Sequence, residues 1–372
     1  MKKKFMLLLG VLCSICFYAC QKSINELKPA VSDENVLSES AADQIGFSAA
    51  MRGNHPPVNL TNGPLQPIDY DLGAGAFTEG PAVDKNGNVF FTDQPHDKIY
   101  KWDANTGNVK LFLTGTGRSN GMGFDEDGNL ISCADMHGEI WKIRPNGKHT
   151  VIAKDYHGKL LNGPNDIWIN HKTGGMYITD PIFPRDYWDA SDPRKQPWEP
   201  THSEQAATGK GGHVYYLAPG CRELVRVTTM EGWNADSWPN GVVGTPDGKK
   251  LYVNQWSYNG TGGIWVFDIK HDGTLSKIKP FVTGLDFCDG MSMDEYGNVY
   301  VSTNLGVKVY NPKGENIETI AVTGGAANNV FAGRNEKTFF MTGGGSGKLF
   351  TQKMNVKGVE KFDNDHNHWN GH

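Results

Sequence analysis

The chain lacks the features that mark several large classes of protein. Its 372 residues include 36 Lys and Arg against 41 Asp and Glu, a net charge of −5, so it has no basic stripe of the kind that binds nucleic acid. It has neither a glycine-rich phosphate loop nor a Gly-x-Ser-x-Gly nucleophile elbow in a usable context. No long amphipathic helix is evident between residues 76 and 351. These absences argue against a nucleic-acid-binding protein, a phosphate-loop enzyme, an α/β-hydrolase and a helical domain.

What the chain does contain is the material of many short strands. It has 46 Gly, 17 Phe, 13 Tyr and 10 Trp, a combination of turn formers and aromatics that is typical of all-β proteins. A tight polar turn followed by a β-rich segment returns six times. The six units are residues 84–92, 125–133, 170–179, 245–254, 294–302 and 334–342.

The spacing of these units predicts a six-bladed β-propeller. Most steps between units are about 40 to 50 residues, the period expected when each repeat is one four-stranded blade. Only the step from the third unit to the fourth is much longer. It contains residues 183–212, rich in Pro, Asp, Lys, Gln and Gly, which we interpret as a surface insertion, either a lid or a plain loop, and not as a seventh blade.

An oxygen-bearing side chain precedes each turn by about five residues. Because the innermost strands of a propeller line its central channel, equivalent positions are predicted to form a ring at one mouth. The predicted ring is Glu79, Asn120, Asn165, Asn240, Asp289 and Asn329. A single Asn or Asp at such a place usually serves the turn itself, but six in one phase favour a site. Carboxylates and amides without Cys or His suit calcium, with magnesium or manganese as alternatives.

The N-terminal residues are predicted to be an export signal and a tether. Three lysines, the apolar run 5–18 and Ala19 before Cys20 resemble a bacterial lipoprotein signal at 1–19. We therefore expect an exported lipoprotein, anchored to a membrane by lipid on Cys20 and facing the periplasm or the cell surface. Residues 20–60 are polar and form the expected tether. The propeller is predicted at 61–355, followed by a polar, His-containing tail at 356–372.

Several short motifs, one or more in each of the first five blades, resemble those of the SMP-30/gluconolactonase/LRE-like family of six-bladed lactonases. The motifs are Phe77–Ala82, Arg118–Gly121, Leu161–Asp166, Thr179–Pro181, Pro239–Gly241 and Cys288–Met291. They occur in order, and the resemblance spans about residues 70 to 350. It leaves the predicted tether and tail uncovered.

The resemblance implies a metal-dependent hydrolase that opens a sugar lactone, a small-molecule substrate. The implied metal is usually calcium, with another divalent cation such as Mg²⁺, Mn²⁺ or Zn²⁺ possible, and the implied ligands are Glu79, Asn165, Asn240 and Asp289. Positions that face the substrate in the family correspond here to Arg118, Asn120 and His137.

Chemistry at such a site would need a base beside the metal. A bound calcium ion can polarise the lactone carbonyl, but it acidifies water less than zinc does, so a side chain must accept the proton. Asp289 is the predicted catalytic base, with Asp135 or Asp180 as substitutes, whereas Cys288 is discounted as a nucleophile because strand alternation points it away from its neighbour's side. Two alternatives remain: another calcium-dependent esterase or phosphotriesterase, and a non-catalytic propeller that binds glycan or protein around a structural calcium. We expect a monomer with no nucleic-acid partner.

Overall fold

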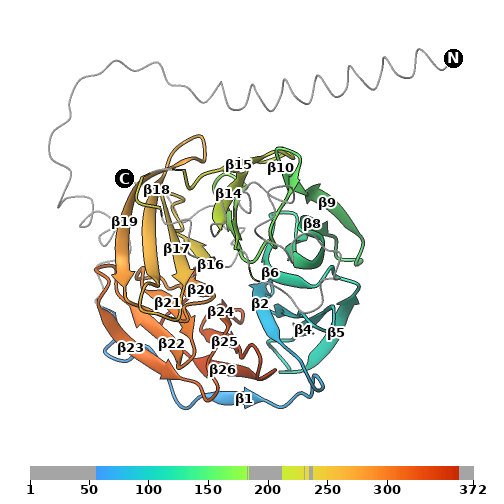
Figure 1. Ribbon diagram of the computed structural model, residues 1–372. Coiled ribbons are helices and arrows are strands. Elements are labelled where there is room, and N and C mark those ends of the chain that lie inside the picture. The colour runs from blue at the N-terminus through green and yellow to red at the C-terminus, as the bar shows by residue number, and fades with distance from the viewer. Residues whose placement is uncertain (1–55, 182, 184–211, 230, 234–237, 360–372) are drawn as a thin grey trace, which may run out of the picture.

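A computed structural model describes residues 56–181, 183, 212–229, 231–233 and 238–359. Within these residues six four-stranded antiparallel sheets are arranged as blades around a central channel (Figure 1). Blades one to three consist of β2 (Thr78–Val83), β3 (Val89–Asp93), β4 (Lys98–Trp102) and β5 (Val109–Thr114); β6 (Ser119–Phe124), β7 (Leu130–Ala134), β8 (Glu139–Ile143) and β9 (His149–Ala153); and β12 (Ile167–Asn170), β13 (Gly175–Asp180), β14 (His213–Leu217) and β15 (Leu224–Arg226). The all-β, six-bladed prediction is confirmed.

The other three blades follow the same inside-to-outside order. They consist of β16 (Trp238–Gly244), β17 (Lys250–Trp256), β18 (Gly263–Ile269) and β19 (Leu275–Thr283); β20 (Met291–Met293), β21 (Val299–Thr303), β22 (Gly306–Tyr310) and β23 (Asn316–Ala321); and β24 (Asn328–Ala332), β25 (Thr338–Thr342), β26 (Leu349–Lys353) and β1 (Gln66–Ile68). A small hairpin, β10 (Asp155–Tyr156) and β11 (Lys159–Leu160), and one 3₁₀ turn, η1 (Asp135–His137), complete the described elements.

The last blade is closed by the first strand of the propeller. β1 pairs antiparallel with β26, with Pro67 opposite Phe350, and lies at the outer edge of the blade in Figure 1. Residues from both ends of the described chain therefore share one sheet. This pairing holds the circle of blades together, because the blade cannot be completed without the N-terminal strand.

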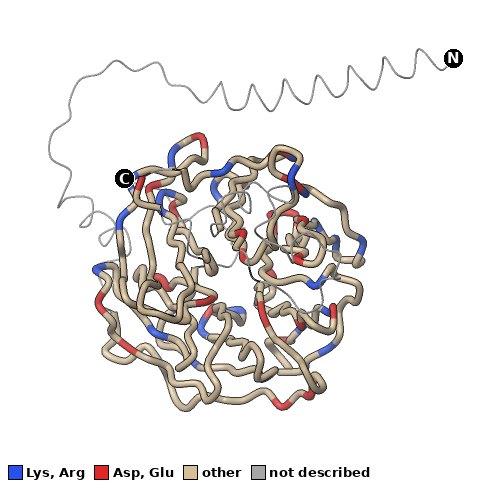
Figure 2. Tube along the Cα trace, viewed as in Figure 1, with Lys and Arg blue, Asp and Glu red and all other residues tan. Residues whose placement is uncertain are grey.

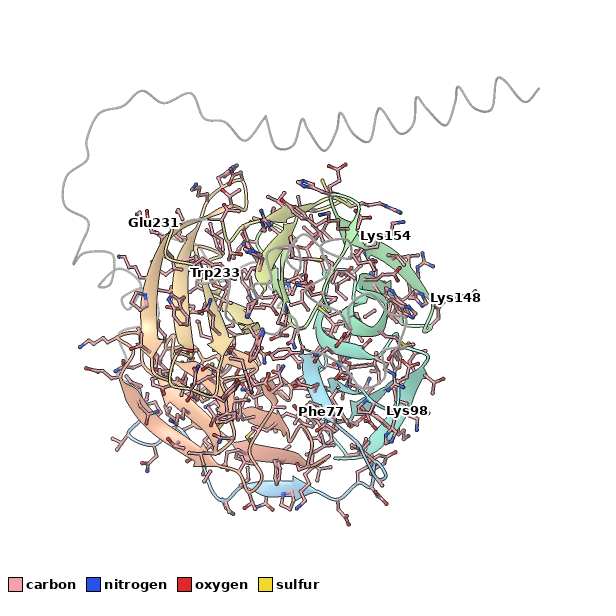
Figure 3. The ribbon with its side chains drawn as sticks, in the orientation of Figure 1. Phe77, Lys98, Lys148, Lys154, Glu231 and Trp233 are labelled. Atoms are coloured by element: carbon pink, nitrogen blue, oxygen red, sulfur yellow. The ribbon has the colours of Figure 1, made fainter. Side chains whose placement is uncertain are left out.

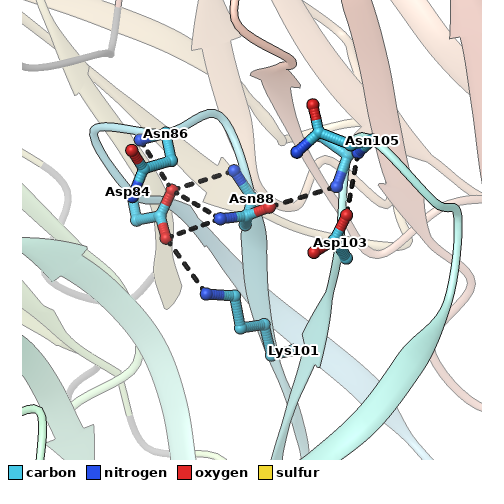
Figure 4. Close-up of polar contacts among 7 residues, drawn as sticks. Asp84, Asn86, Asn88, Lys101, Asp103 and Asn105 are labelled. Atoms are coloured by element: carbon cyan, nitrogen blue, oxygen red, sulfur yellow. Dashed lines mark hydrogen bonds and ion pairs between the residues drawn. The ribbon is translucent and has the colours of Figure 1, made fainter.

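The repeated polar turn is a scaffold for the hairpin between the first two strands of a blade. In blade one, Asp84 Oδ1 accepts hydrogen bonds from the backbone N–H groups of Asn86 and Asn88, both at 2.9 Å. Asn88 Oδ1 in turn accepts from the backbone of Ala104, 3.2 Å away on the next connection, and Lys101 Nζ lies 3.3 Å from Asp84 Oδ2 (Figure 4). Such side-chain to backbone bonds fix the turn and hence the strand that follows.

Large side chains fill the spaces between neighbouring blades. Tyr300 of blade five and Phe331 and Phe339 of blade six are all fully buried, and each pair of their ring centroids lies within about 5 Å. Charged residues are spread more evenly: among the residues drawn in colour in Figure 2, Lys and Arg are scattered among Asp and Glu. None of the described residues forms a helix long and apolar enough to cross a membrane.

Four sequence predictions fall wholly or largely outside the described residues. They are the signal at 1–19, the tether at 20–60 up to residue 55, the insertion at 183–212 apart from its first and last residues, and the tail from residue 360 onward. These stay predictions. At the edge of the predicted tether, Leu60 is buried in the cluster that contains Tyr300, so the chain already packs on the propeller there.

Candidate functional site

A bulge in the innermost strand of each of five blades sets the level of the candidate site. In blade one the pairing of β2 with β3 shifts between Glu79 and Ala82, and β6 and β16 shift in the same way at Asn120 and Asn240. In blades three and five, one residue is bonded through its backbone to two successive residues: Thr179 to Asn165 and Asp166, and Ser302 to Asp289 and Gly290. Because a bulge places two residues opposite one, it re-aims the side chains at that point.

The residues at the bulges are joined from blade to blade through their backbone carbonyls. Each carbonyl accepts a hydrogen bond from the preceding blade: Asn120 O from Thr92 Oγ1 at 3.4 Å, Asn165 O from Gly121 N at 2.6 Å, Asn240 O from Thr179 Oγ1 at 2.7 Å, and Asp289 O from Asn254 Nδ2. The repeated contact shows that these positions are equivalent. The structure therefore brings five of the predicted ring residues to one level of the channel, Glu79 being the fifth by its register.

The prediction that Asn329 is the sixth member of the ring is wrong. In blade six the carbonyl that accepts from the preceding blade belongs to Ala327, at 2.8 Å from Gly290 N. Asn329 lies two residues further along β24, where its Nδ2 donates to Gly290 O at 3.1 Å and to Ser302 Oγ at 2.8 Å. Asn329 thus ties blade six to blade five. We use "channel ring" for Glu79, Asn120, Asn165, Asn240, Asp289 and Ala327.

A second level lies directly after the channel ring, and sequence reasoning missed it. Four blades place glycine here, and in blade one a Cβ on Gly80 would come within 1.9 Å of Asn120 O. The exceptions are Asp166 in blade three and Asn328 in blade six, both buried. Asn328 Nδ2 donates to Glu79 Oε2 at 3.4 Å. The signal in the sequence was the break in an otherwise regular pattern of ring residue followed by glycine.

Asp166 is a buried carboxyl close to the channel ring. Its Oδ1 accepts from the backbone N–H of Ile167 at 2.9 Å, and its Oδ2 accepts from Val242 N at 3.3 Å. Burial, and to a smaller extent the negative charge of Glu79, raise the pKa of Asp166 to about 7. Blades one and three therefore each contribute one buried acidic residue, Glu79 and Asp166.

The donor set fits a hard cation that accepts amide oxygens. Among the described residues there is no group of three or more His, Cys, Asp and Glu side chains suited to a metal, so an ion at the channel ring would depend on Asn165 and Asn240 as well as on carboxylates. Asn240 Oδ1 is buried and has no hydrogen-bond partner within the described structure. Leaving such an oxygen unsatisfied costs ~1–3 kcal/mol. A calcium ion, which binds neutral amide oxygens, would satisfy it.

The predicted substrate-facing residues lie on blade two and its neighbour. Arg118 adopts a left-handed backbone (φ +51°), which Asp97 holds by accepting a 2.7 Å hydrogen bond from Arg118 N. Its guanidinium donates to the carbonyls of Gln94 and Pro95 on blade one. His137 is exposed and stacks on Trp141, with ring centroids 5.5 Å apart. A role for either side chain in substrate binding stays a prediction.

The three candidate bases, Asp289, Asp135 and Asp180, differ in their surroundings. Asp180 accepts hydrogen bonds from the backbones of Asn162 and Gly163 through its two oxygens, at 3.0 and 2.9 Å, so it holds a loop. Asp135 is buried and accepts from Gln94 Nε2 at 2.8 Å. Asp289 is partly exposed. A base must be reached by the water from which it takes a proton, which favours Asp289 over the buried Asp135 and Asp180.

Cys288 is confirmed as an unsuitable nucleophile. The thiol is fully buried and its Sγ donates to Gln255 O at 3.1 Å. Burial raises the pKa of Cys288 to about 12, so the reactive thiolate is not formed near neutral pH. Figure 3 shows the side chains of the blades and labels Phe77, which lies immediately before β2 and two residues before Glu79.

Comparison with known proteins matches the propeller to one family. The SMP-30/Gluconolactonase/LRE-like region matches residues 77–345. The gluconolactonase of Zymomonas mobilis subsp. mobilis is 28% identical over 305 residues, which cover 75% of this chain and 78% of that protein. The diisopropyl-fluorophosphatase of Loligo vulgaris is 28% identical over 261 residues, covering 63% and 75%. Regucalcin from Agrobacterium tumefaciens, solved as a calcium-binding protein, is 16% identical with a TM-score of 0.59, covering 79% and 95%. At this identity the likeness to regucalcin concerns the fold alone.

Proposed function

Because the chain belongs to the SMP-30/gluconolactonase/LRE-like family, we propose that it is a calcium-dependent hydrolase that opens a sugar lactone at the channel ring. The observation that carries the proposal is the level shared by Glu79, Asn165, Asn240 and Asp289, together with the unsatisfied oxygen of Asn240. The relationship to a gluconolactonase supports a lactone as substrate. The carboxylate and amide oxygens of the ring support calcium as the ion.

In this proposal the four residues would hold the ion, and the ion would polarise the lactone carbonyl and stabilise negative charge on its oxygen. Side chains of the protein supply the base and a hydrogen-bond donor. Asp289 accepts a proton as a water oxygen bonds to the carbonyl carbon. The ring C–O bond then breaks, its oxygen takes up a proton as a hydroxyl, and the product is an open hydroxy acid. Asn120, buried at the same level, can donate its amide N–H to the substrate.

A second candidate is hydrolysis of an organophosphate on the same residues. The diisopropyl-fluorophosphatase favours this candidate. It has the same percentage identity to this chain as the gluconolactonase, although over a smaller share of both chains. The two reactions need the same ion site and differ in the walls around it. A shared ion site alone therefore does not choose between them.

A substrate panel separates these candidates from a binding protein. We would measure acid release with a pH indicator for aldonolactones and for a dialkyl fluorophosphate, using the wild type, Asp289→Ala and Glu79→Ala. Asn335→Ala, in the exposed turn before β25, serves as the control. The proposal expects lactone turnover that both site variants reduce at least about a hundredfold. Turnover of the fluorophosphate alone would select the second candidate, and no turnover of either would reject both.

A further inference from the structure

The residues two positions before the channel ring differ sharply around the mouth. They are Phe77, Arg118, Gly163, Trp238, Phe287 and Gly325. Blades four and five contribute Trp238 and Phe287, next to the candidate ligands Asn240 and Asp289. Blade two contributes Arg118, whose guanidinium is bound to backbone carbonyls of blade one. The mouth thus has an aromatic side and a polar side.

The aromatic side extends outward as a cluster of five rings. We call Phe183, Trp238, Trp256, Tyr258 and Phe287 the aromatic cluster. Trp238 and Trp256 face each other across β16 and β17 with centroids 5.2 Å apart. Around Trp256 lie Tyr258 at 5.7 Å and Phe287 at 5.7 Å, and Phe183 lies 5.6 Å from Trp238. The rings meet at mixed angles, from 31° to 89°.

The cluster is open to solvent and continuous with the channel ring. Tyr258 is 64% exposed and Phe287 37% exposed, whereas Trp238 and Trp256 are half-buried. Trp238 lies two residues before Asn240 at the start of β16, and Phe287 lies two residues before Asp289. Contiguous exposed aromatic surface beside a polar site is characteristic of a ligand-binding surface.

Backbone strain at Phe287 also indicates a ligand-binding surface. Phe287 has a left-handed backbone (φ +53°), which is unfavourable for a bulky residue. Its N–H donates to Ser257 O at 2.8 Å, so the loop between β17 and β18 fixes it beside Trp256. A strained conformation that places an aromatic ring at the edge of a site, while costing stability, is typical of a position kept for function.

Several polar groups of that loop, between β17 and β18, are bonded to one another. Ser257 Oγ lies 2.7 Å from Asn259 Oδ1 and 3.1 Å from Thr261 Oγ1, and Thr261 Oγ1 also donates to Asn259 Oδ1 at 2.7 Å. The hydroxyl groups of Ser257 and Thr261 are therefore both engaged by Asn259 Oδ1. An apolar ring placed against the neighbouring aromatic faces would give up no hydrogen bonds to water.

We propose that the aromatic cluster binds an apolar, ring-bearing substituent of the substrate, so that a lactone with an aryl substituent is preferred to the same lactone without it. This inference rests on the proposed function for the reaction, but the subsite itself does not depend on turnover. The lactone ring occupies the channel ring. The aryl group extends outward over Trp256, Tyr258 and Phe287, where edge and offset contacts between aromatic rings are favourable.

The first test compares two lactones that differ only in the substituent, δ-valerolactone and 6-phenyl-δ-valerolactone. For the wild type we expect kcat/KM to be at least tenfold higher for the phenyl compound. Tyr258→Ser and Phe287→Gly, the latter compatible with the positive φ, are each expected to reduce this ratio at least threefold. Leu111→Ser removes an exposed apolar side chain, 50% exposed on β5 of blade one, and is expected to leave the ratio unchanged.

The second test measures binding without turnover. Quenching of tryptophan fluorescence is titrated with 6-phenyl-δ-valerolactam and with δ-valerolactam, which resist hydrolysis. We expect at least tenfold tighter binding of the phenyl compound, reduced in the Tyr258 and Phe287 variants. If the lactams show this difference while no lactone is opened, the proposed function fails and the subsite stands. Equal binding of the two lactams by the wild type, or a preference untouched by both variants, would overturn the subsite.

Discussion

Asn328 of the last blade donates its side-chain amide to Glu79 of the first blade, with Nδ2 3.4 Å from Glu79 Oε2. The two residues are 249 positions apart in the chain, and both are buried. The contact holds a candidate calcium ligand from the blade that closes the propeller. Closure of the fold and geometry of the site are therefore linked at one hydrogen bond.

Replacing Asn328 by Asp should make the protein more dependent on calcium. Asn328→Asp keeps the oxygen that accepts from Asn329 N at 2.8 Å, but it removes the donor to Glu79 and places a like charge beside it. Without a cation the melting temperature should fall, by an amount that corresponds to about 1 kcal/mol or more, and the rise on adding calcium should exceed that of the wild type. Differential scanning fluorimetry with chelator and with calcium measures both. Unaltered melting in chelator would contradict the contact.

Alanine at Gly80 should be far more damaging than alanine at an unconstrained glycine. A Cβ on Gly80 would lie 1.9 Å from the carbonyl oxygen of Asn120, and the backbone there has φ +42°. Gly128, with φ +77° and nothing within 4 Å of a new Cβ, carries the backbone strain without the clash. We expect Gly80→Ala to lose about 1–3 kcal/mol beyond the loss in Gly128→Ala. Urea denaturation measures both, and equal losses would show that blades one and two are not so closely packed.

Much of this architecture could be predicted from the sequence because polar turn residues recur in it at a regular interval. The turn Asp84 to Gly87 fixes the phase of blade one, and blades two and five repeat it at Asp125 and Asp294. In blade six the position five residues after the ring is Ala332, which gives no such signal. The polar turn begins two residues later, at Arg334, so the turn pattern predicts Asn329 in place of Ala327.

Other parts of the site could not be predicted because they depend on contacts between blades. Asp166 and Asn328 occupy places where the other blades have glycine. A Cβ at Gly80, Gly121 or Gly241 would meet a backbone carbonyl of the next blade, a constraint that is visible only in the structure. The aromatic cluster joins β16, the β17–β18 loop and the segment before β20. Trp238 and Phe287 hold equivalent positions two residues before the channel ring, but Phe183, Trp256 and Tyr258 do not, so the cluster as a whole follows no period.

Acid should destabilise the fold partly through His213. Burial, and then the positive charge of Arg226, lower the pKa of His213 to about 4, against about 6.5 when unfolded. Between these values the unfolded chain binds the proton and the folded chain does not, so this contribution to stability is present above about pH 6.5 and is lost as the pH falls toward 4. His213→Gln, which can still bond Thr228, should flatten the curve of melting temperature over that range. A curve as steep as that of the wild type would be inconsistent with a buried neutral His213.

Cys288 should be dispensable for catalysis although it adjoins Asp289. Because burial raises the pKa of its thiol to about 12, Cys288→Ala should keep kcat within about twofold while losing roughly 1 kcal/mol of stability from the smaller side chain. The native thiol should also react slowly with a thiol reagent until the protein is unfolded. A hundredfold loss of kcat with normal calcium binding would reopen a role for the sulfur.

The most direct test of the account is a calcium titration of lactone opening by protein first stripped with chelator. Turnover above the spontaneous rate should be absent in chelator and should return with saturable dependence on calcium in the wild type. Asn240→Leu removes the unsatisfied amide oxygen at nearly constant volume, so it should need at least about tenfold more calcium for half-maximal turnover. Full turnover in chelator, or a wild-type calcium requirement in Asn240→Leu, would contradict the assignment of the channel ring as the metal-binding and catalytic site.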